Sequence, residues 1–168
     1  MTIISNYIEK PNGETIEICS VEQTYCPVCG SELVPHGYCL RKLILSNETK
    51  MFTLRVSFCR CCGRSHRELP DCMIPYKRHC TETYAKIYEL PPEKLDCDID
   101  EKTIRTVRSW LTKFLAFAAT VCGVSEHNDI TSVLNEKEDN ILSKLTYYVR
   151  VVVNADMWMF SVLPLGYY

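Results

Sequence analysis

One short pattern occurs twice in the chain, as Cys26-Pro27-Val28-Cys29-Gly30 and as Cys59-Arg60-Cys61-Cys62-Gly63. We call each copy a knuckle. In each knuckle two thiols lie three positions apart, so one tight turn can direct both sulfurs at a single ion. The glycine that follows lacks the Cβ atom that would crowd such a turn. Two knuckles supply four thiolates, the ligand set of a closed structural zinc site, so we predict a zinc ribbon. The predicted ligands of Zn²⁺ are Cys26, Cys29, Cys59 and Cys62.

Several alternatives remain open at this site. Cys61 lies inside the second knuckle and competes with Cys59, although the spacing to Gly63 favours Cys59 and Cys62. His66 follows Cys62 by four residues and could approach the metal. The same double knuckle also binds iron in rubredoxin-type sites, and four buried thiols without a metal are the remaining interpretation.

The stretch between and after the knuckles has the pattern of β-structure. Residues Met51–Phe58 alternate between apolar and polar side chains, which indicates a half-buried strand. Leu40–Leu45 and Ser65–Leu69 are the other two strands that we expect here. Residues 1–25 are expected to form an irregular arm with one short strand, Thr15–Cys19. A sheet this small has little core of its own, so we expect the metal to stabilise it.

The second half of the chain has helical periodicity. Thr81–Leu90 is a predicted helix that ends at two prolines. A longer helix, about Ile99–Val121, begins after Asp98, which with Glu101 would form a capping box. A further helical segment runs from Asp129 to about Val153, although its last three valines could form a strand instead.

These patterns predict an α+β fold class with two domains. Residues 1–80 form the N-terminal zinc ribbon, a small antiparallel sheet with its N-terminal arm. Residues 81–168 form an all-helical half. Tyr84–Phe114 has the outline of a helix-turn-helix, in which the second helix would present its N-terminal polar face to DNA.

Positive charge is concentrated in residues 36–80, which hold nine Lys or Arg and three Asp or Glu, a net charge of +6. Residues 1–35 and 81–168 each carry a net charge of −4. A basic block in an acidic protein is a candidate footprint for a polyanion, or else the solvated outer face of a small sheet. The predicted nucleic-acid contacts are Arg41, Lys42, Arg55, Arg60, Arg64, Arg67, Lys77, Arg78, Lys102, Arg105 and Arg108.

The composition limits the compartment and the chemistry. An odd total of 11 cysteines, four of them at zinc spacing, favours a reducing cytoplasm over a disulfide framework. No apolar run reaches the roughly 20 residues that a membrane span needs, and no secretory signal begins the chain. The sequence contains no phosphate-binding loop, H-E-x-x-H or G-x-S-x-G motif, and a four-thiolate zinc has no open position for water. We therefore expect a cytoplasmic protein without enzymatic activity or membrane contact.

A set of longer motifs extends beyond the knuckles. It comprises His36-Gly37-Tyr38-x-x-Arg41, Phe52-x-Leu54-Arg55-Val56, Cys59-x-x-Cys62-Gly63-Arg64-x-His66 and Leu69-Pro70-Asp71-x-x-Ile74-Pro75-Tyr76-Lys77-Arg78. With the first knuckle, these motifs resemble a family of small bacterial zinc-ribbon proteins associated with transposable elements. The ribbon alone is similar to the N-terminal zinc finger of certain insertion-sequence transposases. The resemblance covers roughly residues 24–80, and Thr103-Ile104-Arg105-x-x-x-x-Trp110 is similar to the last helix of the helix-turn-helix found in family members. It implies association with DNA.

Two hypotheses follow from these observations. The first is a DNA-binding accessory or regulatory protein of a mobile element, in which the basic residues contact phosphate. The second is a zinc-scaffolded protein-interaction module without a nucleic-acid role. In that case the apolar C-terminal tail, Met157–Tyr168, would bind a protein partner or a second copy of the chain.

Overall fold

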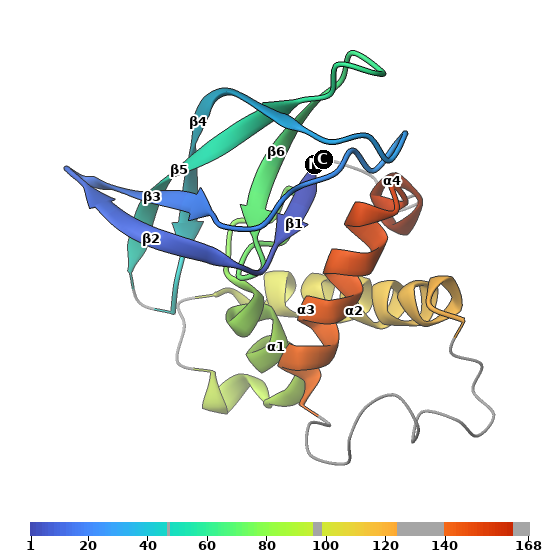
Figure 1. The fold of residues 1–168 in the computed structure, drawn as a ribbon. Helices are drawn as coiled ribbons and strands as arrows, with labels where there is room; N and C mark the ends of the chain where they lie inside the picture. Colours follow the sequence, from blue (N-terminus) through green and yellow to red (C-terminus); the bar gives the residue numbers. More distant parts are fainter. Residues whose placement is uncertain (47, 96–98, 124–139, 163–168) are drawn as a thin grey trace.

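The computed structural model describes residues 1–46, 48–95, 99–123 and 140–162. Within these ranges six strands come first along the chain and the helices follow (Figure 1). The strands are β1 (Thr2–Ile4), β2 (Tyr7–Asn12), β3 (Thr15–Ser20), β4 (Val34–Ile44), β5 (Thr49–Phe58) and β6 (Ser65–Pro70). The helices are α1 (Thr81–Glu89), the 3₁₀ turn η1 (Pro92–Lys94), α2 (Glu101–Val121), α3 (Ile141–Asn154) and α4 (Trp158–Val162).

The six strands form one mixed sheet in the order β1-β6-β5-β3-β2, and β4 pairs with β5. β1 runs parallel to β6 and β3 runs parallel to β5, whereas the other pairs are antiparallel. The sheet curls into an open half-barrel (Figure 1). The predicted small antiparallel ribbon is therefore wrong. The antiparallel unit β4-β5-β6 exists, but it is half of a larger sheet.

The difference arises in residues 1–20, which form three strands instead of an irregular arm with one. β1 has only three residues, and it is recognisable only through its parallel pairing with β6. β2 contains Pro11 and is largely exposed, so it carries no apolar alternation. Pro11 is tolerated because β2 lies at the end of the sheet, where only one neighbour needs hydrogen bonds.

The helices follow the predicted periodicity with shifted ends. α1 matches the predicted helix to within one residue. The N-cap of α2 is Asp100, whose carboxylate accepts a hydrogen bond from the Thr103 backbone N–H at 2.9 Å. The predicted cap, Asp98, lies outside the described residues, as do residues 129–139 of the predicted third segment and residues 163–168 of the tail. Val151–Val153 are helical in α3 and not a strand.

The predicted helix-turn-helix is also wrong. Residues 90–100 separate α1 from α2 and include η1, whereas the motif joins its helices by about three or four residues. Arg108 of α2 donates hydrogen bonds to the carbonyl oxygens of Ile87 and Leu90 at the end of α1. Its guanidinium therefore satisfies carbonyl groups that α1 leaves without helical partners.

One hydrophobic core joins the sheet to the helices. Leu43, Leu54 and Leu69 of the sheet belong to the same buried cluster as Phe114 of α2 and Val152 of α3. The Asn154 side chain, at the end of α3, accepts a hydrogen bond from the Ile3 N–H at 2.8 Å and donates one to the Ile3 carbonyl at 3.1 Å. The helices thus stabilise the sheet directly, and the division at residue 80 stays a prediction. Among the helices of the described ranges, none has both the length and the apolar composition to span a bilayer.

Candidate metal centre

The four predicted ligand sulfurs lie together at one end of the sheet. The Sγ atoms of Cys26 and Cys62 are 3.6 Å apart, and those of Cys29 and Cys59 are 3.4 Å apart. All four lie within 4.8 Å of one another. A tetrahedral ion with metal–sulfur bonds of about 2.3 Å has its ligands separated by about 3.8 Å. The group therefore has the right size to hold one metal ion.

The two knuckles have the same backbone geometry. The Gly30 N–H donates to the Cys26 carbonyl at 2.8 Å, and the Gly63 N–H donates to the Cys59 carbonyl at 2.9 Å. Gly30 and Gly63 have φ angles of 73° and 71°, in the left-handed region that residues with a Cβ disfavour. The repeated spacing and glycine in the sequence thus correspond to one repeated turn.

This geometry predicts unequal effects of adding a Cβ atom at different glycines. Gly63→Ala should destabilise the protein by about 1 kcal/mol or more, because alanine is strained at positive φ. Gly37→Ala is the matched control, since Gly37 does not have a positive φ and its Cβ would meet no atom within 4 Å. Chemical denaturation of the metal-loaded variants measures both changes. Equal stabilities of the two variants would contradict the proposed role of the turn.

Two thiols of the cluster have shifted pKa values, in opposite directions. Hydrogen bonds from the backbone and side chain of Ser31 lower the pKa of Cys29 to about 6. The Arg64 N–H favours the thiolate of Cys62, but loss of hydration and hydrogen bonding with the neighbouring sulfurs raise the pKa of Cys62 to about 12. Of these two thiols, Cys62 therefore keeps its proton until a divalent ion displaces it.

His66 and Cys61 fall outside the group of four. Cys61 is not one of the four cysteines whose sulfurs lie within 4.8 Å of one another, which resolves the competition within the second knuckle in favour of Cys59. His66 is buried, and its Nε2 atom lies 3.4 Å from Cys26 Sγ. Such a contact orients a ligand sulfur from outside the coordination shell.

Sequence reasoning missed the buried carboxylate of Glu68, which is 1% exposed. It accepts hydrogen bonds from Arg55 Nε at 2.8 Å, Ser57 Oγ at 2.5 Å and Thr24 Oγ1 at 3.0 Å. Thr24 and Ser57 each lie two residues before the first cysteine of a knuckle. Glu68 thus joins the two segments that lead to the metal centre. The sequence offered one signal for Glu68, which is one of only three acidic residues in the basic block of residues 36–80.

The predicted nucleic-acid contacts divide into two groups. Four of them make internal contacts: Arg55 with Glu68, Arg41 with the Ile74 and Lys77 carbonyls, Lys77 with the Trp110 ring, and Arg108 with α1. The others are exposed: Lys42, Arg60, Arg64, Arg67, Arg78, Lys102 and Arg105. Within the exposed group, Arg105 pairs with Glu101 at 3.3 Å, and Arg64 lies 4.0 Å from Asp156.

Comparison with known proteins gives one result, a family match. No curated protein and no solved structure matches the chain. Residues 26–110 match the model of a family described as a domain of unknown function, DUF6431. The matched span is half of the chain and contains both knuckles, β4 to β6, α1 and the first half of α2. The chain therefore belongs to the DUF6431 family.

Proposed function

We propose that the protein is a zinc-stabilised nucleic-acid-binding protein. Zn²⁺ fits the four-thiolate set because it favours tetrahedral sulfur coordination. Four protein ligands leave no open position, so the ion has a structural and not a catalytic role. Iron is the competing metal, and it would colour the purified protein red. Elemental analysis that finds one zinc per chain in colourless protein supports the proposal, and stoichiometric iron contradicts it.

The observation that carries nucleic-acid binding is a group of exposed arginines beside the metal centre. Arg60 lies in the second knuckle, Arg64 follows it directly, and Arg67 lies on β6. Of the three, only Arg64 has an acidic neighbour among the described residues, and its 4.0 Å contact with Asp156 is between two exposed side chains. Such a pair contributes little in water. The group is therefore available to phosphate, which binds with a strong dependence on salt.

We predict that the double variant Arg60→Glu with Arg64→Glu weakens binding to a labelled single-stranded DNA oligonucleotide by about tenfold or more at low salt. Loss of two phosphate contacts should also reduce the slope of log affinity against log salt by about 1.4. Fluorescence anisotropy across a salt series measures both quantities. The metal content of the variant should be unchanged, because both side chains are exposed and neither is a ligand.

The matched control is Lys94→Glu with Lys113→Glu, which changes the net charge equally at exposed positions of the helical half. This control should bind as the unmodified protein does. Equal losses in the two double variants would show that only overall charge matters. Absence of binding to single-stranded and duplex DNA at low salt would overturn the proposal. The association with mobile elements rests on the resemblance described above.

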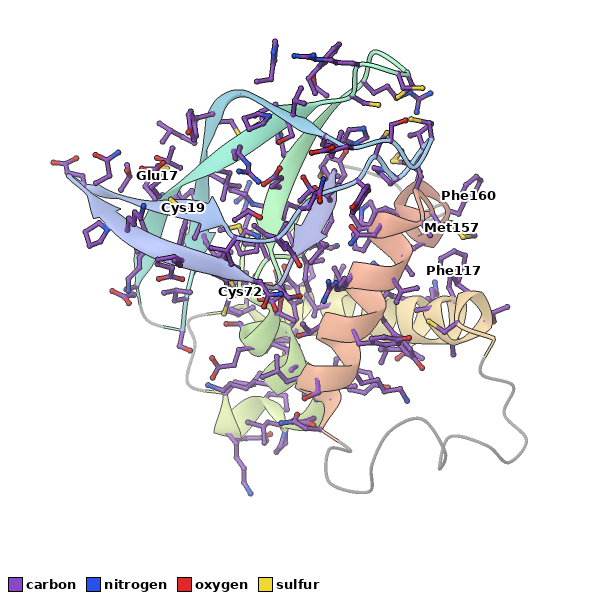
Figure 2. All side chains as sticks on the ribbon, in the orientation of Figure 1. Glu17, Cys19, Cys72, Phe117, Met157 and Phe160 are labelled. Carbon is purple, nitrogen blue, oxygen red and sulfur yellow. The ribbon has the colours of Figure 1, made fainter. Side chains whose placement is uncertain are left out.

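A protein-interaction role is the second candidate, and one observation favours it. Met159 and Phe160 of α4 are 56% and 62% exposed. Phe160 points away from the body of the protein, while Phe117 of α2 and Met157 lie nearby (Figure 2). Replacement of Phe160 by Ser would then lower an oligomeric mass measured by light scattering while leaving nucleic-acid binding unchanged. A monomeric parent protein would contradict self-association.

A further inference from the structure

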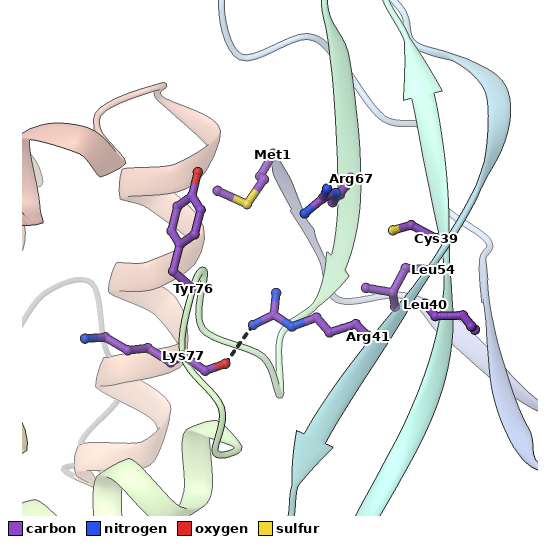
Figure 3. A pocket seen from close by; sticks show the side chains of 8 residues that line it. All are labelled: Met1, Cys39, Leu40, Arg41, Leu54, Arg67, Tyr76 and Lys77. Atoms are coloured by element: carbon purple, nitrogen blue, oxygen red, sulfur yellow. Dashed lines mark hydrogen bonds between the residues drawn. The ribbon is translucent and has the colours of Figure 1, made fainter. Parts of the chain in front are cut away.

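A pocket of about 210 Å³ opens between the sheet and the segment that leads to α1 (Figure 3). This volume is below the roughly 300–1,000 Å³ of pockets for drug-sized ligands. The pocket therefore suits a single small group better than a whole cofactor. The lining residues that matter here are Arg41 of β4, Arg67 of β6, Tyr76 and Lys77.

Arg41 is fixed in position within this pocket. Its Nη2 atom donates to the carbonyl oxygens of Ile74 at 2.6 Å and Lys77 at 3.0 Å. Both bonds use the same nitrogen, so Nε and Nη1 keep their N–H donors for a ligand. The two acceptors are neutral carbonyls, and they leave the positive charge of the guanidinium uncompensated.

Arg67 adds a second positive charge to the same pocket. Burial and the neighbouring charge of Arg67 lower the pKa of Arg41, so the two guanidinium groups interact. Among the described residues that line the pocket, none is Asp or Glu. Two like charges without an acidic partner attract an anion, and guanidinium groups bind phosphate oxygens through paired hydrogen bonds.

Tyr76 supplies an aromatic surface beside these charges. It has a φ of 60°, which is rare for a residue with a bulky side chain, and it is 60% exposed. A backbone outlier of this kind is a reason to look for function. Figure 3 shows Tyr76, Met1 and Arg67 around the same space, into which Arg41 extends from β4. Lys77 contributes its carbonyl, because its amino group lies over the Trp110 ring, 4.1 Å from the centroid.

We propose that this pocket binds one phosphate group of a single-stranded nucleic acid, with the adjacent base stacked on Tyr76. An exposed ring can stack on an unpaired base, whereas the bases of a duplex are already stacked on one another. The inference rests on the nucleic-acid binding proposed above and adds to it a site and a preference for single strands.

The test measures the binding of four variants of the zinc-loaded full chain to the same labelled single-stranded DNA oligonucleotide. Arg67→Ala should weaken binding about tenfold, through loss of phosphate contacts. Tyr76→Gly should also weaken it about tenfold, through loss of stacking, while the fold is kept because glycine accepts positive φ. Tyr76→Phe keeps the ring and should bind as the parent does. Arg78→Ala is the matched control, because Arg78 is exposed in the same segment but does not line the pocket.

Thermal melts check that each variant is folded, and Arg41 is left intact because it holds the segment through Ile74 and Lys77. Losses in Arg67→Ala and Tyr76→Gly but not in Arg78→Ala support the inference. If DNA binds but neither Arg67→Ala nor Tyr76→Gly weakens the binding, the pocket is not the phosphate site and the proposed function stands. If single-stranded and duplex DNA compete equally, the single-strand preference is overturned. If the zinc-loaded parent protein binds no DNA at low salt, both proposals fail.

Discussion

Cys59→Ser is expected to reduce the metal content from one ion per chain to none and to lower the free energy of unfolding by about 3 kcal/mol or more. Cys59 is fully buried, and structural zinc contributes about 10–16 kcal/mol in peptides that fold around it. We expect a smaller loss here because Cys26, Leu33 and Cys59 form a cluster separate from the main core. A loss of this size lowers the melting temperature by about 10 °C in a chain of this length.

The matched control is Cys61→Ser, which makes the same chemical change two positions away at an exposed side chain. It should retain the metal and melt with the parent protein. Hydrogen exchange should show that Cys59→Ser opens the two knuckles while the core strands remain protected. Global unfolding would mean that the metal, and not the shared core of sheet and helices, holds the fold together. Unchanged metal content in Cys59→Ser would refute the assignment of the centre.

The cluster of four cysteines could be predicted from the sequence because the geometry of each cysteine pair is local. Each knuckle is a single turn in which a cysteine pair, a following glycine and two backbone hydrogen bonds determine one another. The strands β4 to β6 could be predicted from the sequence for a similar reason. Met51–Phe58 alternates clearly between apolar and polar side chains, and this strand, β5, leads directly into the second knuckle.

The rest of the sheet could not be predicted because it depends on contacts between distant residues. β1 is a strand only because it pairs with β6, 66 residues further along the chain at Thr2 and Glu68. β3 pairs in parallel with β5, a relation that no local pattern encodes. The buried state of Glu68 likewise depends on Arg55, Ser57 and Thr24 arriving from other segments. The list of predicted nucleic-acid contacts also included cations that are not free to bind DNA, since Arg41, Arg55 and Arg108 bond within the protein.

The Glu68 network leads to the second large effect. Glu68→Gln should lower the free energy of unfolding by about 3 kcal/mol, because it removes the charge that Arg55 pairs with at 2.8 Å. Glu68 is almost wholly buried and the Arg55 side chain is 23% exposed, so the effect should lie at the lower end for a broken buried ion pair. Urea denaturation of the metal-loaded protein measures the change.

The matched control for Glu68→Gln is Glu48→Gln, which removes the partner of Lys50 in a 2.7 Å ion pair between exposed side chains. Glu48→Gln should lower the free energy of unfolding by less than about 1 kcal/mol. The double variant Glu68→Gln with Arg55→Met should recover part of the loss, because no unpaired charge then stays inside the sheet. Equal effects of Glu68→Gln and Glu48→Gln would mean that the Glu68 network contributes no more to stability than a surface ion pair does. A large effect with recovery in the double variant would show that the two knuckles are held together by a buried ion pair as well as by the metal.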